Sequence, residues 1–421
     1  MSKEVRQTRL PSGLTVVTDP METVETLSIG VWVDAGTRDE PAEINGVSHL
    51  LEHMAFKGTE RRTARDIAEE MDAVGGHLNA YTARDHTAYY AKVLKEDSEL
   101  ALDIVADILQ HSTMDEAELA REQTVVVQEI CQAIDTPDDI IFDHFQAVAF
   151  PDQPLGRPVL GTEALVRAMT RDTVLGYMRD HYSAPNMVLA AAGRIDHDRL
   201  VEMADRAFAA LPAPQAAGAR GARYVGGDFR EDRDIEQVNL VVGFDGVSYA
   251  DPDYYAASVL STLLGGGMSS RLFQEVREKR GLVYSIYSFS TSYTEGGLFG
   301  IYAGTGEDEI EELVPVMCDE IVGVTRGVDR VEVDRARAQL KASILMSLES
   351  TSSRCELLAR QMVIYGRPMP VAEVVAKVEA ITADDVVRVA RRLFATPPTV
   401  AVLGPLAKAP DYQSIAARLK L

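Results

Sequence analysis

Two segments of this chain recur at one fixed interval, and this repeat constrains the fold more than any other feature. Residues 188–193 resemble residues 399–404, and their closing glycines, at positions 193 and 404, lie 211 residues apart. An earlier strand-like run ends at Val33, and its counterpart ends at Phe244, at the same interval. A shared interval at two distant points predicts a duplicated fold.

The length and local pattern of the chain fit a duplication of this size. A chain of 421 residues suits two domains of about 200 residues each. Alternating, β-branched stretches such as residues 87–94 are mixed with longer helical stretches. Residues 212–221 are rich in Ala, Pro and Gly and carry almost no charge. The sequence therefore predicts an α+β fold with a first domain at 1–211, a linker at 212–224 and a second domain at 225–421.

Composition argues against several classes of function. The formal net charge is −23 and the sequence pI is near 4.8, which argues against a nucleic-acid partner. No apolar run approaches the ~20 residues that span a bilayer, so no membrane partner is expected. The first residues lack the apolar core of a secretory signal, and the three cysteines are widely spaced. We therefore expect a cytoplasmic protein, and a preference for cationic peptides where acidic groups line a cavity.

Residues 46–59 form the stretch with the clearest chemistry. His49 and His53 stand four residues apart, so on a helix both imidazoles project from one face and can reach one metal ion. Glu52 overlaps that face and lies close enough to act on a water held by the ion. The order His-x-x-Glu-His is a zinc-hydrolase signature. The alternative interpretation is an amphipathic helix with two solvated histidines.

A zinc hydrolase needs a third protein ligand, and a predicted helix at residues 115–130 offers two carboxylates. Glu122 and Glu129 are seven residues apart, so two helical turns place them on nearly the same face. Spacing alone does not decide between them.

With these residues in place, the whole chain resembles the pitrilysin and insulinase family of zinc peptidases. It is most similar to half-length bacterial members that resemble the mitochondrial processing peptidase beta subunit. The resemblance implies that Glu129, in its Glu-Ile context, is the third ligand, and that Glu122 supports activity without binding metal. It also implies one Zn²⁺ per chain and a zinc-dependent endopeptidase. The expected substrates are unfolded or short peptides, with basic, presequence-like peptides as the expected class.

The same resemblance implies details of the fold and of substrate binding. Each domain is expected to hold a mixed, mainly antiparallel sheet covered by helices on one side. Asn79 and Ala80 match an edge strand onto which the peptide adds as a further strand. Arg277 and Tyr284, seven residues apart, match a pair that contacts the peptide near the scissile bond. The plainer alternatives are a strand-to-turn transition for the first pair and ordinary packing for the second.

The second half is expected to be a homologous, metal-free domain that contributes substrate contacts. At the repeat interval the metal-binding stretch becomes apolar at residues 259–264, and all eight histidines precede the linker. The glycines at 265–267 are not followed by the Lys-Ser/Thr of a phosphate-binding loop, which argues against nucleotide binding.

Other functions and assemblies stay open from the sequence alone. Inactive relatives serve as partner or structural subunits, although these typically lack part of the metal motif. A hydrolase of small amides or esters is a further alternative, against which the predicted edge strand argues. Full-length family members join four such domains around a chamber, and this chain supplies two. We therefore expect a homodimer, with a heterodimer containing a metal-free sister chain as the alternative.

Overall fold

A computed structural model describes residues 4–209, 211 and 221–421, and its contacts divide the chain into two compact units. The first unit comprises Met1–Cys131, Arg157–Arg220 and Met346–Met369. The second unit comprises Gln132–Gly156, Gly221–Leu345 and Pro370–Leu421. Each unit therefore contains one segment from the other half of the sequence.

The first unit is built on a six-stranded sheet with the strand order β1-β2-β6-β3-β5-β4. Only β2 and β6 pair in parallel; the other neighbours are antiparallel. A hairpin whose turn contains Gly13 joins β1 to β2, and β4 and β5 form a second antiparallel pair. The strands are β1 (Arg6–Arg9), β2 (Thr15–Pro20), β3 (Thr26–Val33), β4 (His77–Thr82), β5 (Thr87–Leu94) and β6 (Met187–Gly193).

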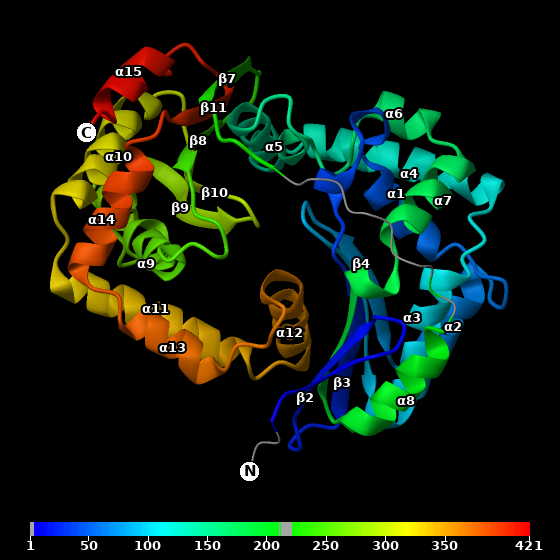
Figure 1. Ribbon diagram of the computed structural model, residues 1–421. Helices are drawn as coiled ribbons and strands as arrows, with labels where there is room; N and C mark the ends of the chain where they lie inside the picture. Colours follow the sequence, from blue (N-terminus) through cyan, green and yellow to red (C-terminus); the bar gives the residue numbers. More distant parts are fainter. Residues whose placement is uncertain (1–3, 210, 212–220) are drawn as a thin grey trace. The chain divides into compact units, whose positions relative to one another are not determined.

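Helices cover both faces of this first sheet. On one face the alternate residues of β3, such as Val31, pack against α1, α3 and α8 in the main core. On the other face Trp32 packs against α12, which contacts β2, β3 and β6. Helix α12 lies beside β2 and β3 in Figure 1. The helices of this unit are α1 (Val47–Ala55), α2 (Ala64–Ala73), α3 (Ser98–Gln110), α4 (Glu116–Ile134), α6 (Glu163–Ala168), α7 (Arg171–His181), α8 (His197–Ala207) and α12 (Thr351–Tyr365).

The second unit repeats this plan without a counterpart of β1. Its sheet has the order β7-β11-β8-β10-β9, and only β7 and β11 pair in parallel. Each strand has a partner at the equivalent place in the first sheet, which is the arrangement that a duplication produces. The strands are β7 (Gly227–Asp232), β8 (Val238–Asp245), β9 (Val283–Ser292), β10 (Gly297–Thr305) and β11 (Thr399–Gly404).

This second sheet is also covered on both faces. Helices α9, α10 and α14 pack against one face, where Val242 of β8 lies in the core. Helix α5 packs against the other face, where Val241 lies. The helices of this unit are α5 (Pro137–Ala149), α9 (Tyr254–Gly265), α10 (Ile310–Arg326), α11 (Arg330–Ser347), α13 (Val371–Glu379), α14 (Ala383–Phe394) and α15 (Tyr412–Arg418), with a π-helical turn at Phe273–Glu278.

The predicted fold class is confirmed, and one detail of it is wrong. The two sheets are mixed and mainly antiparallel, but helices cover both faces of each sheet, because α12 and α5 are exchanged between the halves. Most of the predicted linker, residues 212–220, lies outside the described residues. The boundaries at 211 and 225 stay a prediction.

Within the part of the chain that the structure describes, no helix is both long enough and apolar enough to cross a membrane.

Candidate metal centre

Helix α1 carries three of the predicted site residues on its more open side. Gly46 begins the helix with φ of 98°, a left-handed conformation that suits glycine, and the helix ends at Ala55. Leu50 and Leu51 are fully buried in the core of the first unit, and they fix the rotation of the helix. His49, Glu52 and His53 are therefore presented together on the remaining side.

The start of α1 is held by Glu40, a buried residue that the sequence did not single out. One carboxylate oxygen accepts hydrogen bonds from the Gly46 backbone N–H at 2.8 Å and from the Asn45 side chain at 2.7 Å. The other accepts the Ser48 N–H at 2.8 Å. Burial raises the pKa of Glu40, while these hydrogen bonds oppose the rise. The carboxylate satisfies free N–H groups at the helix start from outside the usual capping position, so local spacing gave no signal for it.

Glu129 of α4 approaches both histidines of α1 with a single oxygen atom. Its Oε2 lies 3.5 Å from Nε2 of His49 and 3.5 Å from Nε2 of His53. Bonds of about 2.0–2.2 Å from Zn²⁺ to nitrogen and oxygen put tetrahedral ligand atoms roughly 3.4 Å apart. The three side chains thus have the spacing and the donor atoms of a zinc site.

The protonation of His49 also suits a metal. Burial, and then the neighbouring His53, lower the pKa of His49 to about 4. The imidazole of His49 is therefore neutral near pH 7 and keeps a lone pair for a metal ion. Among the described residues, His49, His53 and Glu129 are the single group of three or more His, Cys, Asp and Glu side chains close enough together to hold an ion.

Glu122 lies beside this group, but it faces Nδ1 of His53, whereas Glu129 faces Nε2 of the same ring. Its Oε2 is 2.9 Å from Nδ1 of His53. Because a carboxylate only accepts hydrogen bonds, Nδ1 is the protonated nitrogen, and Nε2 is left with the lone pair that points at Glu129. This is the position of a residue that orients a ligand without being one.

Glu52 is the remaining carboxylate of the site and is held by one hydrogen bond. Its Oε2 accepts a hydrogen bond of 2.6 Å from the Thr82 hydroxyl at the end of β4. Burial raises the pKa of Glu52, and the Thr82 hydrogen bond and His53 oppose this rise. Thr82 was not predicted, because its contact with Glu52 depends on how the end of β4 passes α1 in space.

Asn79 and Ala80 lie on β4, which is an edge strand of the first sheet. Asn79 is exposed, and its side-chain oxygen accepts the Ala80 N–H at 2.9 Å. β4 pairs with β5 alone, so its other backbone edge is free of sheet partners in the described chain.

Arg277 and Tyr284 belong to the second unit and lie next to each other there. The Arg277 guanidinium stands 5.7 Å from the ring centre of Tyr284 and 4.9 Å from that of Phe273. The Tyr284 side chain is 78% exposed at the start of β9. Tyr284 therefore presents an accessible hydroxyl, and Arg277 lies half-buried beside it.

The helix of the second unit that corresponds to α1 has no ligands to offer. On α9 the repeat interval places Leu260, Leu263 and Leu264 where the first unit has His49, Glu52 and His53. All three leucines are buried in the core of the second unit. At these three positions the helix packs into the core and offers no metal ligand.

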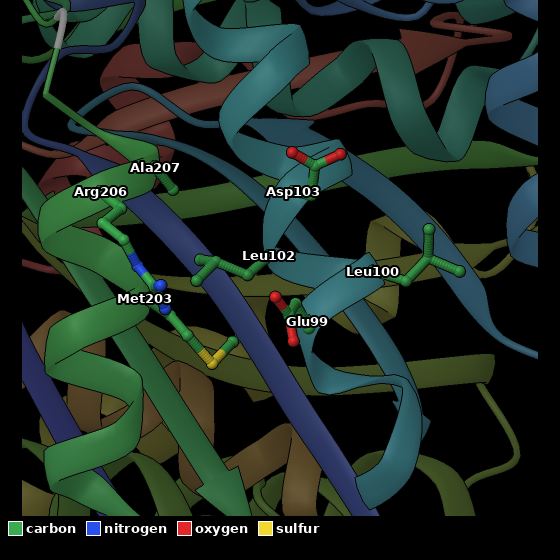
Figure 2. Close-up of a pocket in the computed structure, with 7 residues that line it drawn as sticks. All are labelled: Glu99, Leu100, Leu102, Asp103, Met203, Arg206 and Ala207. Carbon is green, nitrogen blue, oxygen red and sulfur yellow. The ribbon is translucent and has the colours of Figure 1, made fainter.

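A separate hollow of about 480 Å³ lies between α3 and α8 of the first unit (Figure 2). Leu102 and Met203 form part of its wall, and Glu99, Asp103 and Arg206 stand around it (Figure 2). None of the predicted site residues lines this hollow. It does not belong to the metal centre.

Comparisons with known proteins agree over nearly the whole chain. A family model described as insulinase (peptidase family M16) matches residues 15–163, and one described as the peptidase M16 inactive domain matches residues 168–340. An uncharacterized zinc protease of Rickettsia felis is 40% identical over 406 residues, covering 96% of this chain and 98% of that protein.

Two further relatives extend this result. The mitochondrial-processing peptidase subunit beta of Neurospora crassa is 38% identical over 406 residues, covering 92% of this chain and 85% of that protein. The crystal structure of a protease from Helicobacter pylori has the same fold, with a TM-score of 0.89 at 22% identity, covering 96% of this chain and 100% of that one. The family predicted from the metal motif is confirmed: the chain belongs to peptidase family M16, the insulinase family.

Proposed function

We propose that this chain is a zinc-dependent endopeptidase that hydrolyses unfolded or short peptides. One observation carries the proposal: a single oxygen of Glu129 stands 3.5 Å from Nε2 of both histidines, and Glu52 projects from the same helix. The zinc protease and processing peptidase names of the relatives support it. The complete set of metal-motif residues argues against an inactive partner subunit.

In this proposal His49, His53 and Glu129 hold one Zn²⁺, and each other residue has a separate task. Zinc, when bound, supplies Lewis acidity toward a peptide carbonyl and lowers the pKa of a bound water. Glu52 accepts a proton from the attacking water and returns it to the leaving nitrogen of the cleaved bond. Thr82 orients the Glu52 carboxylate through its 2.6 Å hydrogen bond.

Substrate contacts are assigned to the β4 edge and to the second unit. The free edge of β4, at Asn79 and Ala80, pairs with the peptide backbone, which explains a preference for extended, unfolded substrates. Arg277 binds a peptide carbonyl, and the Tyr284 hydroxyl donates a hydrogen bond to the oxygen that becomes negative in the transition state. Backbone recognition of this kind is largely indifferent to sequence.

The first test is metal-dependent cleavage by the purified protein. An unstructured peptide with a central fluorophore and quencher should be cleaved, cleavage should stop after removal of metal with a chelator, and added Zn²⁺ should restore it. Mass spectrometry should find internal cleavage sites, as an endopeptidase requires. Zinc-loaded protein that cleaves no unstructured peptide would instead favour the partner-subunit function, and cleavage of small amides alone would favour a different hydrolase.

We further propose that basic, presequence-like peptides are preferred, because the chain has a net charge of −23. At low ionic strength a basic peptide should show a higher kcat/KM than an acidic peptide of matched length and cleavage site. The difference should shrink as salt is added, since salt screens the attraction. Equal cleavage of both peptides at low salt would remove the electrostatic part of this proposal.

For assembly we propose a homodimer with one zinc site in each chain. The motif residues and the Arg277/Tyr284 pair occur in one sequence, so no complementary partner chain is needed for either set. Light scattering on the protein purified alone should give about twice the chain mass of 46.0 kDa. A monomer that gains activity only when a second, different chain is added would show the heterodimer instead. The expected absence of nucleic-acid and membrane partners, and the cytoplasmic location, stay predictions.

A further inference from the structure

Lys57 follows the end of α1 and reaches the carboxylate that orients His53. Its Nζ lies 2.8 Å from Oε1 of Glu122, while Oε2 of Glu122 lies 2.9 Å from Nδ1 of His53. Glu122 therefore uses one oxygen for the lysine and the other for the histidine. The three side chains form a chain of contacts that ends at a proposed zinc ligand.

A tight turn at the end of α1 places the lysine near Glu122. The helix ends at Ala55, and the Lys57 backbone N–H donates to the carbonyl of Met54, three residues back, at 3.1 Å. Such a bond tightens the chain as it leaves the helix. The contacts at 2.8 Å and 2.9 Å show that Lys57 and His53 both reach Glu122 of α4 from this end of the helix.

Because the Glu122 carboxylate is buried, it depends on Lys57 for a counter-charge. The Glu122 side chain is 7% exposed, whereas that of Lys57 is 30% exposed. A buried carboxylate needs a counter-charge and hydrogen-bond donors to stay in place. A histidine that binds metal is neutral, so His53 supplies a hydrogen bond but no full charge. Lys57 is the one lysine or arginine that forms an ion pair with Glu122 in the described part of the chain.

A second lysine–glutamate ion pair in the same unit is far more exposed than the pair of Lys57 and Glu122. Lys95 pairs with Glu25 at the surface, where the two side chains are 43% and 65% exposed. Exposed pairs of this kind contribute little to stability, because water screens them and the long side chains lose freedom when they pair. Neither residue contacts a member of the metal centre, so Lys95 serves as a matched control.

We propose that Lys57 is a positioning residue of the metal centre. Its ammonium group holds the Glu122 carboxylate in the one direction in which Glu122 can accept the Nδ1–H of His53. His53 is thereby kept in the tautomer and ring orientation that turn Nε2 toward Glu129 and His49. This inference rests on the proposed function, because it assumes that the three side chains bind zinc.

The test measures zinc affinity rather than activity, by competition with a chromophoric chelator. Replacing an orienting partner of a zinc ligand typically weakens metal binding about 10- to 100-fold, so Glu122→Gln should fall in that range and Lys57→Met near about tenfold. Lys57→Arg, which keeps the charge, should retain most of the affinity. Lys95→Met should bind zinc as the unchanged protein does.

A double variant tests whether Lys57 acts through Glu122. If it does, Lys57→Met combined with Glu122→Gln should bind zinc no more weakly than Glu122→Gln alone, because contacts in one network are not additive. The visible absorption bands of the cobalt-substituted protein should also shift in Lys57→Met, since the ligand geometry at His53 changes. Circular dichroism confirms that each variant folds, and Lys57→Gln replaces Lys57→Met if the latter does not.

Three results would overturn this inference, and they can be told apart from one another. Unchanged zinc affinity and an unchanged cobalt spectrum in folded Lys57→Met would remove the positioning role and leave the zinc site intact. Additive losses in the double variant would likewise show that Lys57 does not act through Glu122. Failure of the unchanged protein to bind zinc would overturn the proposed function itself, and this inference with it.

Discussion

Replacing Glu52 by glutamine should reduce peptide hydrolysis about 10²- to 10⁴-fold, the range that proton transfer by a positioned side chain contributes. Glutamine has nearly the size of glutamate, and its amide oxygen can still accept the hydrogen bond that Thr82 now donates to Glu52. The amide cannot take a proton from water at neutral pH. The loss should therefore appear in kcat, with the zinc content unchanged.

Glu43→Gln provides the matched control for this substitution. Glu43 is exposed, lies outside α1 and makes the same chemical change possible without touching the metal centre. Metal analysis and steady-state kinetics on both variants separate loss of zinc from loss of the base. A Glu52→Gln protein that contains one zinc per chain and still cleaves peptides at the original rate would show that Glu52 is not the base.

The part of the metal centre that was predictable is the part set by residue spacing within one helix. His49, Glu52 and His53 lie within two turns of one helix, so the period of the helix alone brings them together. Glu129 needed the family resemblance, because α4 meets α1 only through the packing of the unit. Arg277 and Tyr284 are seven residues apart, so their closeness in the chain alone made it predictable that they lie side by side.

The residues that support the site could not be predicted from the sequence, and their contacts show why. Glu40 reaches the start of α1 from a preceding loop, and Thr82 reaches Glu52 from the end of β4. Such contacts depend on where a loop and a strand pass in space, and no period or motif of the sequence encodes them. Lys57 lies within residues 46–59, but its partner Glu122 is on another helix.

The exchanged helix α12 illustrates the same limit for the fold. Cys355, Leu358, Ala359 and Met362 recur at the spacing of an amphipathic helix, which predicts one apolar face. That pattern does not say which sheet the face covers. The helix lies within the second repeat in sequence, yet it packs on the sheet of the first unit, beside β2 and β3 (Figure 1). Trp32 and Ala190 are among its contacts there.

This packing leads to the largest effect on stability that we expect. Leu358 is 5% exposed and lies in the apolar cluster between α12 and the first sheet. Truncating a buried leucine to alanine removes apolar contacts and leaves a cavity, which costs about 2–5 kcal/mol of unfolding free energy. Leu358→Ala should therefore destabilise the first unit by about that amount.

The neighbouring leucine supplies a control with the same change of side chain. Leu357 is 39% exposed, so Leu357→Ala should change the unfolding free energy by no more than about 0.5 kcal/mol. Denaturant unfolding can be followed by the fluorescence of Trp32, the single tryptophan of the chain, which is 2% exposed in the same cluster as Leu358. Its signal reports the contact between α12 and the first sheet directly. Equal, small effects of the two substitutions would mean that α12 does not hold this face of the sheet, whereas a large effect of Leu358→Ala alone would show that the first sheet depends on a helix supplied by the second repeat.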